Sequence, residues 1–309
     1  MIGERYLITG GSGQLGSDLK MLMDGCGVHY LAPSETELDF GISESVESFF
    51  SQNRGKFSFI IHCAAFTNVD GCEAEREKAY LINAGSTETL ARICNLQRIP
   101  MLYISTDFVF DGTGKIPYET FDVPAPLSVY GASKLEGEKA VRHNCPDHYI
   151  VRTSWLFGTA GNNFPRAILK KAASGDNLQV VNDQIGSPTF SRDLAEGLLA
   201  ILGIEYPFSG IEFSGVKGVP APFGTYHFSN AGAASWFDFA SEILRMAGRA
   251  NGIAPITSAQ LGRAAARPAY SVLSHTGINS IGITARPWRE ALATFLSELR
   301  IQSPDLFPN

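Results

Sequence analysis

The sequence is poor in cysteine and in basic residues, and it has no long hydrophobic run. Its 309 residues include five cysteines, which are widely spaced and form no Cys-x-x-Cys pair, and six histidines without metal-ligand spacing. This pattern argues against a disulfide framework and a zinc knuckle, and it indicates a reducing compartment. We therefore expect no bound metal.

Positive charge is also scarce. Lys and Arg number 25 against 31 Asp and Glu, which gives a formal net charge of −6. Nucleic acid and anionic membranes are not expected partners, because binding to phosphates requires a basic surface. The longest nearly apolar stretch, residues 57–66, is far shorter than the roughly 20 residues of a membrane-spanning helix. The N-terminal residues show no signal-peptide hydrophobic region, so we expect a cytoplasmic protein.

Strand-like and helix-like patterns alternate along the first half of the chain, which indicates parallel strands joined by right-handed crossovers. The sequence thus predicts an α/β fold with a doubly wound, Rossmann-type parallel sheet and a smaller C-terminal α/β domain. Strands are expected at residues 6–9, 28–32, 57–63, 101–105, 150–152, 178–181 and 226–228, and helices at residues 14–23, 43–50, 74–96, 130–138, 164–173, 193–202, 236–246 and 288–299. Ser43 and Ser191 are the expected N-caps of two of these helices. Residues 204–222, rich in Gly and Pro, are expected to form a surface loop or insertion.

Three glycines follow the first expected strand in a G-x-x-G-x-x-G turn. Gly10 permits a tight turn, Gly13 lets the backbone approach a pyrophosphate, and Gly16 allows the helix to pack closely on the strand. The backbone amides near Gln14 and Leu15 then face the diphosphate at the positive end of the helix dipole. An ordinary glycine-rich turn is the alternative, but the position of this turn in a βαβ pattern favours a bound nucleotide.

Tyr130 and Lys134 are four residues apart, so they share one face of a helix. A phenol has a pKa of about 10, and a neighbouring ammonium lowers that pKa by favouring the phenolate. A solvated surface pair is the common explanation of this spacing. Here, however, Ser105 and Thr106 end an apolar strand, at the sheet edge where such folds bind ligands. This context favours a catalytic pair.

Together these features resemble the extended short-chain dehydrogenase/reductase family in its Thr-Tyr-Lys form. Further segments, in order along nearly the whole chain, are similar to the dTDP-4-dehydrorhamnose reductase family. The most specific are Ser-Thr-Asp-Phe-Val-Phe-Asp-Gly at 105–112 and Arg-Thr-Ser-Trp at 152–155, and the others lie at 64–70, 129–134, 161–164, 182–189, 266–268 and 271–273. Residues 204–222 are the visible addition.

The resemblance implies a role for each residue of the catalytic set. Tyr130 would donate a proton to the sugar O4 as hydride arrives at C4 from the nicotinamide. Lys134 would lower the pKa of that tyrosine and bind the nicotinamide ribose, and Thr106 would align the carbonyl. Ser105 is expected to form only a local hydrogen bond to the backbone.

The resemblance also assigns binding residues. Asp39 and Phe40 would flank the adenine, and Ala64 and Ala65 would line the cofactor ribose, in addition to the glycine turn. The sugar pocket would be shaped by Thr67, Val69, Trp155 and Asn163. For Trp155 and Phe40 a place in the hydrophobic core is the alternative. Asp18, where some relatives carry a metal-binding glutamate, is expected to be a solvated helix carboxylate.

The implied activity is NAD(P)H-dependent reduction of the C4 keto group of dTDP-4-dehydro-L-rhamnose to dTDP-L-rhamnose. One alternative is another nucleotide-sugar epimerase, dehydratase or reductase on the same fold. Phe108 follows Asp107 where dehydratases carry a second carboxylate, which counts against dehydration. The other alternative is a non-catalytic regulatory subunit resembling that of methionine adenosyltransferase.

Cofactor choice has little support in the residues. The second expected strand ends at Pro33 and Ser34, without the acid of NAD sites or the Arg of NADP sites. We expect the turn at Pro33 to carry Glu35 and Glu37 away from the ribose. Both NADPH and NADH should therefore be used, with NADPH modestly preferred because of the resemblance.

The domains and partners follow from the same resemblance. Residues 1–155 and parts of 183–232 are expected to bind the dinucleotide, and residues 156–182 and most of 233–309 the nucleotide sugar. The expected partners are the nucleotide-sugar substrate and a second copy of the chain in a homodimer.

Overall fold

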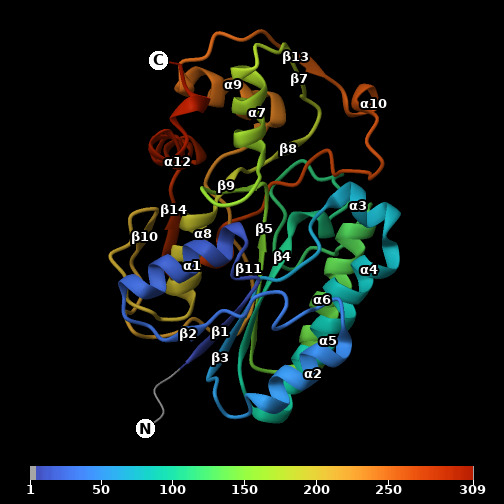
Figure 1. Cartoon of the computed structure of the whole chain (residues 1–309), viewed down its shortest axis with the longest axis vertical. Coiled ribbons are helices and arrows are strands. Elements are labelled where there is room, and N and C mark those ends of the chain that lie inside the picture. Colours follow the sequence, from blue (N-terminus) through green and yellow to red (C-terminus); the bar gives the residue numbers. More distant parts are fainter. Residues whose placement is uncertain (1–4, 309) are drawn as a thin grey trace.

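The computed structural model describes residues 5–308. A six-stranded sheet forms its centre, in the order β11-β5-β4-β3-β1-β2, and every neighbouring pair is parallel (Figure 1). The strands are β1 (Tyr6–Thr9), β2 (Tyr30–Leu31), β3 (Phe59–His62), β4 (Met101–Thr106), β5 (His148–Thr153) and β11 (Gly224–His227). The chain passes from β1 outwards to β2 and then to β3 on the other side of β1. The predicted doubly wound sheet is confirmed.

Helices cover both faces of this sheet (Figure 1). On one face lie α1 (Gln14–Gly25) and α8 (Ser191–Ile201); on the other lie α2 (Ser43–Gln52), α5 (Ser86–Gln97) and α6 (Val129–Asn144). Successive strand residues point to opposite faces, so Leu7 joins the core under α2 and α5 while Ile8 joins the core under α1 and α8. Both faces are buried, which explains the continuous apolar runs in these strands.

The helix expected at residues 74–96 is broken into several pieces. The structure has α3 (Val69–Ala74), α4 (Arg76–Tyr80), a π-helical turn (Leu81–Gly85) and then α5. In that turn Asn83 is buried, and its amide accepts from the Phe66 N–H (2.8 Å) and donates to the Phe66 carbonyl (3.1 Å) and to Ser133 Oγ (3.0 Å). A buried amide requires such partners, and they lie outside the helix, where a sequence period cannot reveal them.

The C-terminal part forms a second hydrophobic cluster, at the top of Figure 1. In it α7 (Phe164–Ala173), α9 (Trp236–Ala247) and α12 (Trp288–Gln302) pack together beside the parallel pair β7 (Leu178–Val181) and β13 (Ile253–Ile256). The proposed domain division stays a prediction, and its end points at residues 1 and 309 lie outside the described residues. Shorter elements are β6 (Leu156–Phe157), β8 (Ile185–Gly186), β9 (Thr189–Phe190), β12 (Ala234–Ser235), α10 (Ser258–Leu261) and α11 (Thr276–Ser280), together with 3-10 turns at Asp107–Val109 and Pro304–Leu306.

Two N-cap expectations are wrong, and the loop or insertion expected at residues 204–222 contains a short strand. Residues 204–222 are not only a loop, because β10 (Ile211–Phe213) pairs antiparallel with β14 (Ile283–Ala285). Ser43 and Ser191 are the first helical residues rather than N-caps, and the cap positions are held by Ile42 and Phe190. The Ser191 hydroxyl donates instead to the Asp18 carboxylate on α1.

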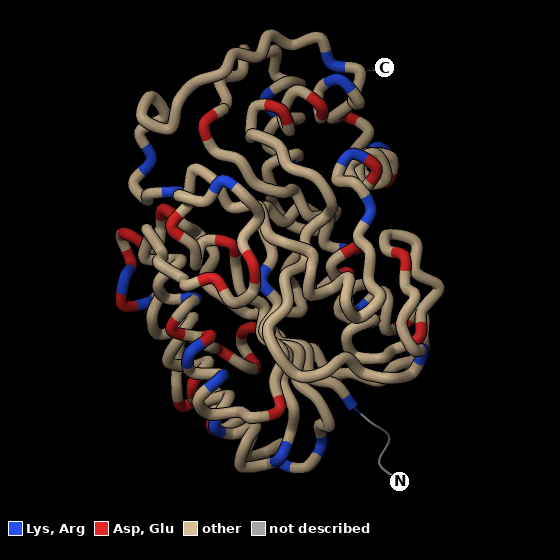
Figure 2. The backbone as a smooth tube through the Cα atoms, turned by 180° about the vertical axis from the view of Figure 1, so that it is seen from behind, with Lys and Arg blue, Asp and Glu red and all other residues tan. Residues whose placement is uncertain are grey.

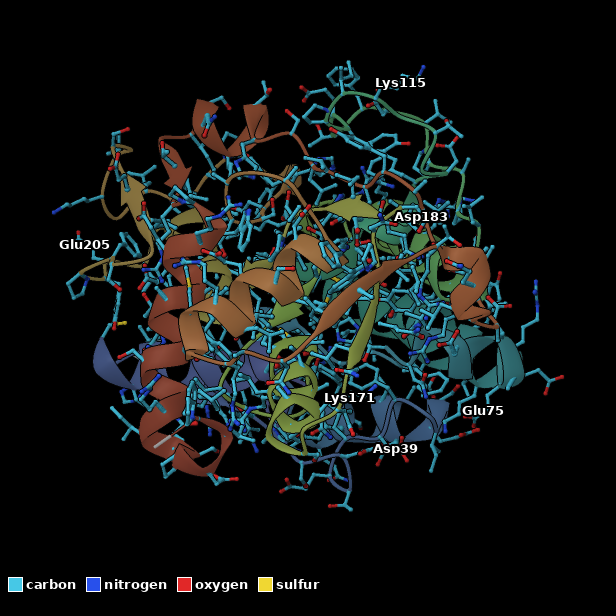
Figure 3. All side chains as sticks on the ribbon, turned by 90° about the horizontal axis from the view of Figure 1, so that it is seen from above. Asp39, Glu75, Lys115, Lys171, Asp183 and Glu205 are labelled. Atoms are coloured by element: carbon cyan, nitrogen blue, oxygen red, sulfur yellow. The ribbon has the colours of Figure 1, made fainter. Side chains whose placement is uncertain are left out.

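Charged side chains of both signs are distributed over the molecule. In Figure 2 Lys and Arg lie interspersed with Asp and Glu, and in Figure 3 Lys115 and Glu205 project outwards at the periphery. All five cysteines are free. From residue 5 to residue 308, no helix has both the length and the apolar character needed to cross a membrane.

Candidate active site

A cavity of about 880 Å³ lies at the carboxyl ends of the central strands. It is bordered by residues that follow β1 and β3, by the ends of β4 and β5, and by Phe164 and Trp236 from the C-terminal cluster. The sequence-predicted residues along it are Gly10, Gly13, Gln14, Leu15, Gly16, Asp39, Phe40, Ala64, Ala65, Thr67, Val69, Thr106, Tyr130, Lys134 and Trp155. The structure therefore brings together all of the predicted site residues except Asn163.

The glycine turn brings the end of β1 close to the end of β3. Gly10 has a φ of +67°, and a Cβ there would lie 2.8 Å from the backbone nitrogen of Ala64. A Cβ on Gly16 would collide with the Gly10 carbonyl oxygen. No side chain caps α1 at Gly13, so within the described chain its first amides have no side-chain acceptor. These amides form one end of the cavity and can bind an anionic group.

Residues 33–41, which follow β2, form the rim of the cavity. Polar side chains in this rim form hydrogen bonds to near neighbours in the sequence. Glu37 accepts from both the backbone N–H (2.8 Å) and the hydroxyl (2.7 Å) of Ser34, and Asp39 accepts from the Gly41 N–H (2.7 Å). Glu35 and Asp39 line the cavity. Glu35 thus stays at the cavity while Glu37 does not line it, and the expectation that the turn at Pro33 carries both away from the ribose stays a prediction.

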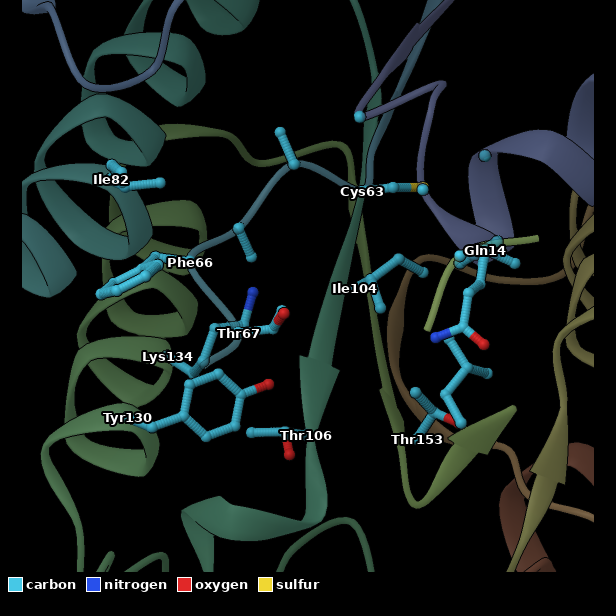
Figure 4. Close-up of a pocket in the computed structure, with 18 of the residues that line it drawn as sticks. Gln14, Cys63, Phe66, Thr67, Ile82, Ile104, Thr106, Tyr130, Lys134 and Thr153 are labelled. Carbon is cyan, nitrogen blue, oxygen red and sulfur yellow. The ribbon is translucent and has the colours of Figure 1, made fainter. Parts of the chain in front are cut away.

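The candidate catalytic residues meet where β4 ends and α6 begins. Ser128 caps α6 by accepting from the Gly131 N–H (3.2 Å). A Cβ on Gly131 would overlap the Phe108 carbonyl oxygen, so only glycine lets α6 approach the turn after β4 so closely. Figure 4 shows Tyr130 and Lys134 on this helix, on the side that faces Thr106.

Burial controls the protonation of this pair. It raises the pKa of Tyr130 above its usual value, with a smaller increase from the Asp107 charge and a decrease from the hydrogen bond to Thr106. Burial outweighs the groups that lower this pKa, and the predicted lowering by Lys134 stays a prediction. Burial lowers the pKa of Lys134 to about 7, against the opposing effects of Glu138 and Cys63. Tyr130 is consequently protonated at neutral pH, as a proton donor must be.

Asp107, to which the sequence assigned no role, lies beside Thr106. The Thr106 hydroxyl donates to Asp107 Oδ1 (3.1 Å) and accepts from the Phe108 N–H (3.2 Å). The second carboxylate oxygen of Asp107 is buried and has no hydrogen-bond partner among the described residues. Burial raises the pKa of this carboxyl to about 6, although Ser271 and Thr106 act in the opposite direction. The sequence could have indicated Asp107, because it directly follows the threonine that is expected to be catalytic.

Behind these residues a buried ion pair connects β4, β5 and α6. The Glu138 carboxylate accepts from Ser105 Oγ (2.6 Å) and from Arg152 Nε and Nη2 (2.8 Å each). The expected local backbone bond of Ser105 is thus replaced by a bond to a side chain 33 residues away. His227 Nε2 lies 3.2 Å from Arg152 Nη1. Burial and the adjacent Arg152 lower the pKa of His227 to about 3, so this ring is neutral and accepts from the guanidinium.

Two stacked indoles border the cavity. The rings of Trp155 and Trp236 are 3.6 Å apart between centroids and nearly parallel, at 8°. Trp155 has a φ of +47°, and Trp236 Nε1 donates to Gln184 Oε1 (3.2 Å). Trp155 therefore both packs on the C-terminal cluster and faces the cavity, as Phe40 does in its own core. Trp236, distant in sequence, was missed.

Asn163 and Asp18 serve packing in this structure. Asn163 caps α7 by accepting from the Arg166 N–H (3.1 Å), and it donates to Gln14 Oε1 (3.1 Å), so it supports a residue of the cavity wall. Its predicted contact with the sugar stays a prediction. Asp18 is only 5% exposed, accepts from Ser191 and lies 3.7 Å from Arg192 Nε. The expectation of a solvated carboxylate is wrong, because α8 covers α1 at this point.

Arg267 is a cavity residue that the sequence analysis did not single out. It makes two hydrogen bonds to Asp70, of 3.1 and 2.8 Å, and so connects the C-terminal segment to α3. This ion pair lowers the pKa of Asp70. The Ala-Arg-Pro motif at 266–268 was the available signal. Among residues 5–308, no group of three or more His, Cys, Asp or Glu side chains is arranged to hold a metal ion.

Comparison with known proteins gives one consistent result. The family model of the RmlD substrate binding domain matches residues 4–301. The spore coat polysaccharide biosynthesis protein SpsK of Bacillus subtilis is 38% identical over 95% of this chain and 97% of that protein. A dTDP-4-dehydrorhamnose reductase of Streptomyces griseus is 37% identical over 93% and 91%, respectively. The crystal structure of a Bacillus anthracis dTDP-4-dehydrorhamnose reductase in complex with NADP has a TM-score of 0.86 and 36% identity, and covers 96% of this chain and 99% of that one.

Proposed function

Because the chain belongs to the RmlD substrate-binding domain family, we propose that it is an NADPH-dependent reductase of the dTDP-4-dehydrorhamnose type. It reduces the C4 keto group of dTDP-4-dehydro-L-rhamnose and forms dTDP-L-rhamnose. The observation that carries this proposal is the convergence of Thr106, Tyr130 and Lys134 on one cavity of about 880 Å³. The names of the relatives and the NADP complex of the Bacillus anthracis enzyme support it.

The residues present fit a dinucleotide. The uncapped amides at the start of α1 suit its diphosphate, and Ala64 and Ala65 lie where the glycine turn and β3 approach each other. Asp39 and Phe40 line the cavity where the adenine is expected. When bound, the reduced nicotinamide supplies the hydride that the carbonyl carbon receives.

Side chains of the protein donate the proton and stabilise the negative charge that its transfer leaves. Tyr130 donates its proton to the sugar O4, and its raised pKa keeps that proton in place at neutral pH until it is needed. Lys134 places a positive charge near the phenolate that this step leaves, and it binds the nicotinamide ribose. Thr106, held by Asp107 and the Phe108 N–H, aligns the carbonyl.

The sugar nucleotide occupies the part of the cavity between the central sheet and the C-terminal hydrophobic cluster of α7, α9 and α12. Thr67 and Val69 border it from the segment after β3, and Trp155 from the segment after β5. Arg267 offers a guanidinium to the anionic diphosphate. Apart from Thr67, Val69 and Trp155, we expect residues 1–155 with parts of 183–232 to bind mainly the dinucleotide, and residues 156–182 with most of 233–309 to bind the sugar nucleotide.

Product analysis tests the proposal directly. The purified chain is incubated with NADPH and a panel of 4-keto nucleotide sugars, and the products are identified by NMR. We expect one C4 hydroxyl for each NADPH oxidised, with the dTDP-linked 4-dehydro-L-rhamnose as the preferred substrate. An altered sugar without net oxidation of NADPH would instead support an epimerase, and the absence of any turnover would support a non-catalytic subunit.

Location and assembly are also part of the proposal. We expect the protein in the cytoplasmic fraction, and a homodimer stays a prediction. Cell fractionation tests the first, and light scattering of the purified protein at two concentrations tests the second.

A further inference from the structure

Tyr103 lies in the middle of β4, beneath the ammonium of Lys134. The Lys134 Nζ is 4.0 Å from the centroid of the Tyr103 ring. Tyr103 is fully buried, and Lys134 is only 3% exposed. In the part of the chain that the structure describes, the ammonium makes no ion pair and no hydrogen bond. Its attractive contact is therefore the cation–π contact with the ring face.

The ring is held in place by the hydrogen bond of its hydroxyl and by the close packing of α6 against it. Its hydroxyl donates to the Asn83 carbonyl oxygen in the π-helical turn (3.2 Å), and the Lys134 carbonyl oxygen lies 3.4 Å from it. A Cβ on Gly137 would overlap both the Tyr103 hydroxyl and the Asn83 carbonyl oxygen. A glycine in the interior of a helix is destabilising. Here it lets α6 lie directly against Tyr103, which fixes the distance between ring and ammonium.

The charged neighbours of Lys134 do not replace this contact. On α6, Glu138 is one turn away, but Ser105 and two arginines already hold its oxygens. From β3 and its end come His62, whose pKa burial lowers to about 3, and Cys63, whose pKa burial raises. His62 is therefore neutral, and so is the Cys63 thiol. The cavity also contains Glu35, Asp39, Lys78, Asp107, Tyr130 and Arg267.

A buried ammonium without a carboxylate partner is expensive in free energy, because it has lost its hydration. The face of an aromatic ring carries partial negative charge and attracts a cation most strongly where water is excluded. We propose that Tyr103 is a positioning residue whose ring face holds the Lys134 ammonium, in its charged form, beside Tyr130. The inference rests on the proposed function, because only there does the charge on Lys134 serve the proton donor.

The matched variants are Tyr103→Leu, which removes the aromatic face, and Tyr103→Phe, which keeps it and removes only the hydroxyl. The pKa of Lys134 is measured without turnover, from the rate of its acetylation by acetic anhydride between pH 5 and 10, with the labelled peptide quantified by mass spectrometry. Tyr103→Leu should lower this pKa by about one unit, and Tyr103→Phe by much less. The pH at which kcat/KM declines should move down by the same amount, because activity is lost as the pH rises through the pKa of Lys134.

Unchanged acetylation and pH profiles in a folded Tyr103→Leu variant would overturn the inference, as would equal shifts in both variants. If Tyr103→Leu does not fold, 3,4,5-trifluorophenylalanine at position 103 keeps the ring shape and weakens its negative face. The pKa of Lys134 should then be lower in this variant than in Tyr103→Phe, and equal Lys134 pKa values in the two variants would overturn the inference. Product analysis with NADPH separates the two proposals: absence of turnover in the wild type contradicts the proposed function, while the acetylation measurement, which needs no turnover, still decides the role of Tyr103.

Discussion

Two sides of the cavity differ in how their polar side chains are held. On the wall formed by β4 and α6, buried groups bind partners from other elements, as Glu138 does with Ser105 and Arg152. On the rim after β2, exposed groups bind their own near neighbours, as Glu37 does with Ser34. The first arrangement fixes the chemistry through long-range contacts. The second consists of side chains that can change without disturbing the fold, and we propose that these recognise the adenosine ribose.

The largest effect is expected at Tyr130 on the wall. Tyr130→Phe keeps the ring but removes the proton donor, so kcat should fall by about 10²–10⁴-fold. Cofactor affinity, measured by fluorescence titration with NADPH, should change little. A Phe variant that reduces the 4-keto sugar at the wild-type rate would show that another group donates the proton.

The buried ion pair should govern stability. Glu138→Gln leaves the Arg152 guanidinium buried without its counter-charge, which should lower the free energy of unfolding by roughly 3–5 kcal/mol. Glu136→Gln is the matched control, because Glu136 pairs with Lys139 on the exposed face of the same helix. Its effect should be below about 1 kcal/mol. Similar losses for the two variants in urea denaturation would remove the distinction between buried wall and exposed surface.

Lys134→Met should lower kcat by about a hundredfold, as expected when one stabilising donor is lost, and should weaken NADPH binding. Burial lowers the pKa of Lys134 to about 7 in the folded chain. The charged form is therefore present below this pH and is lost as the pH rises through it. The wild-type rate of reduction should decline above about pH 7, and the variant should lack that decline. A pH profile and NADPH affinity identical to those of the wild type would contradict both roles of Lys134.

The smallest effect is expected at the rim. Without an Arg to bind a 2′-phosphate, and with Glu37 bound to Ser34, discrimination between NADPH and NADH should stay below about a hundredfold in kcat/KM. Ser34→Arg should raise the preference for NADPH by about tenfold, because a guanidinium binds phosphate in a bidentate manner. A larger wild-type preference would mean that a wall residue, and not the rim, recognises the ribose.

The same contrast explains what the sequence could reveal. Elements with a regular local pattern were predicted with their true bounds, as α7 and β7 were, and the spacing of Tyr130 and Lys134 marked their shared face. Contacts between distant segments left no such pattern. Ser191 has the composition of an N-cap, yet its hydroxyl binds Asp18, 173 residues away.

The cavity residues that the sequence did not reveal have the same origin. Tyr103 reads as one more apolar strand residue until α6 packs on it, and Trp236 reads as the start of a helix until it stacks on Trp155. Asp107 and Arg267 lie inside motifs that mark the family, but only the fold shows that they face the cavity. Local periodicity therefore predicts elements, whereas the identity of a site's supporting residues depends on tertiary contacts.

We propose that the buried wall directs hydride to C4 of a nucleotide sugar. Transfer is followed directly with NADPH deuterated at the transferable position of the nicotinamide and the dTDP-linked 4-dehydro-L-rhamnose as substrate. We expect one deuterium at C4 of the product sugar for each NADPH oxidised, and a correspondingly slow appearance of that product with Tyr130→Phe. A product without deuterium at C4, or deuterium at any other carbon, would contradict this proposal.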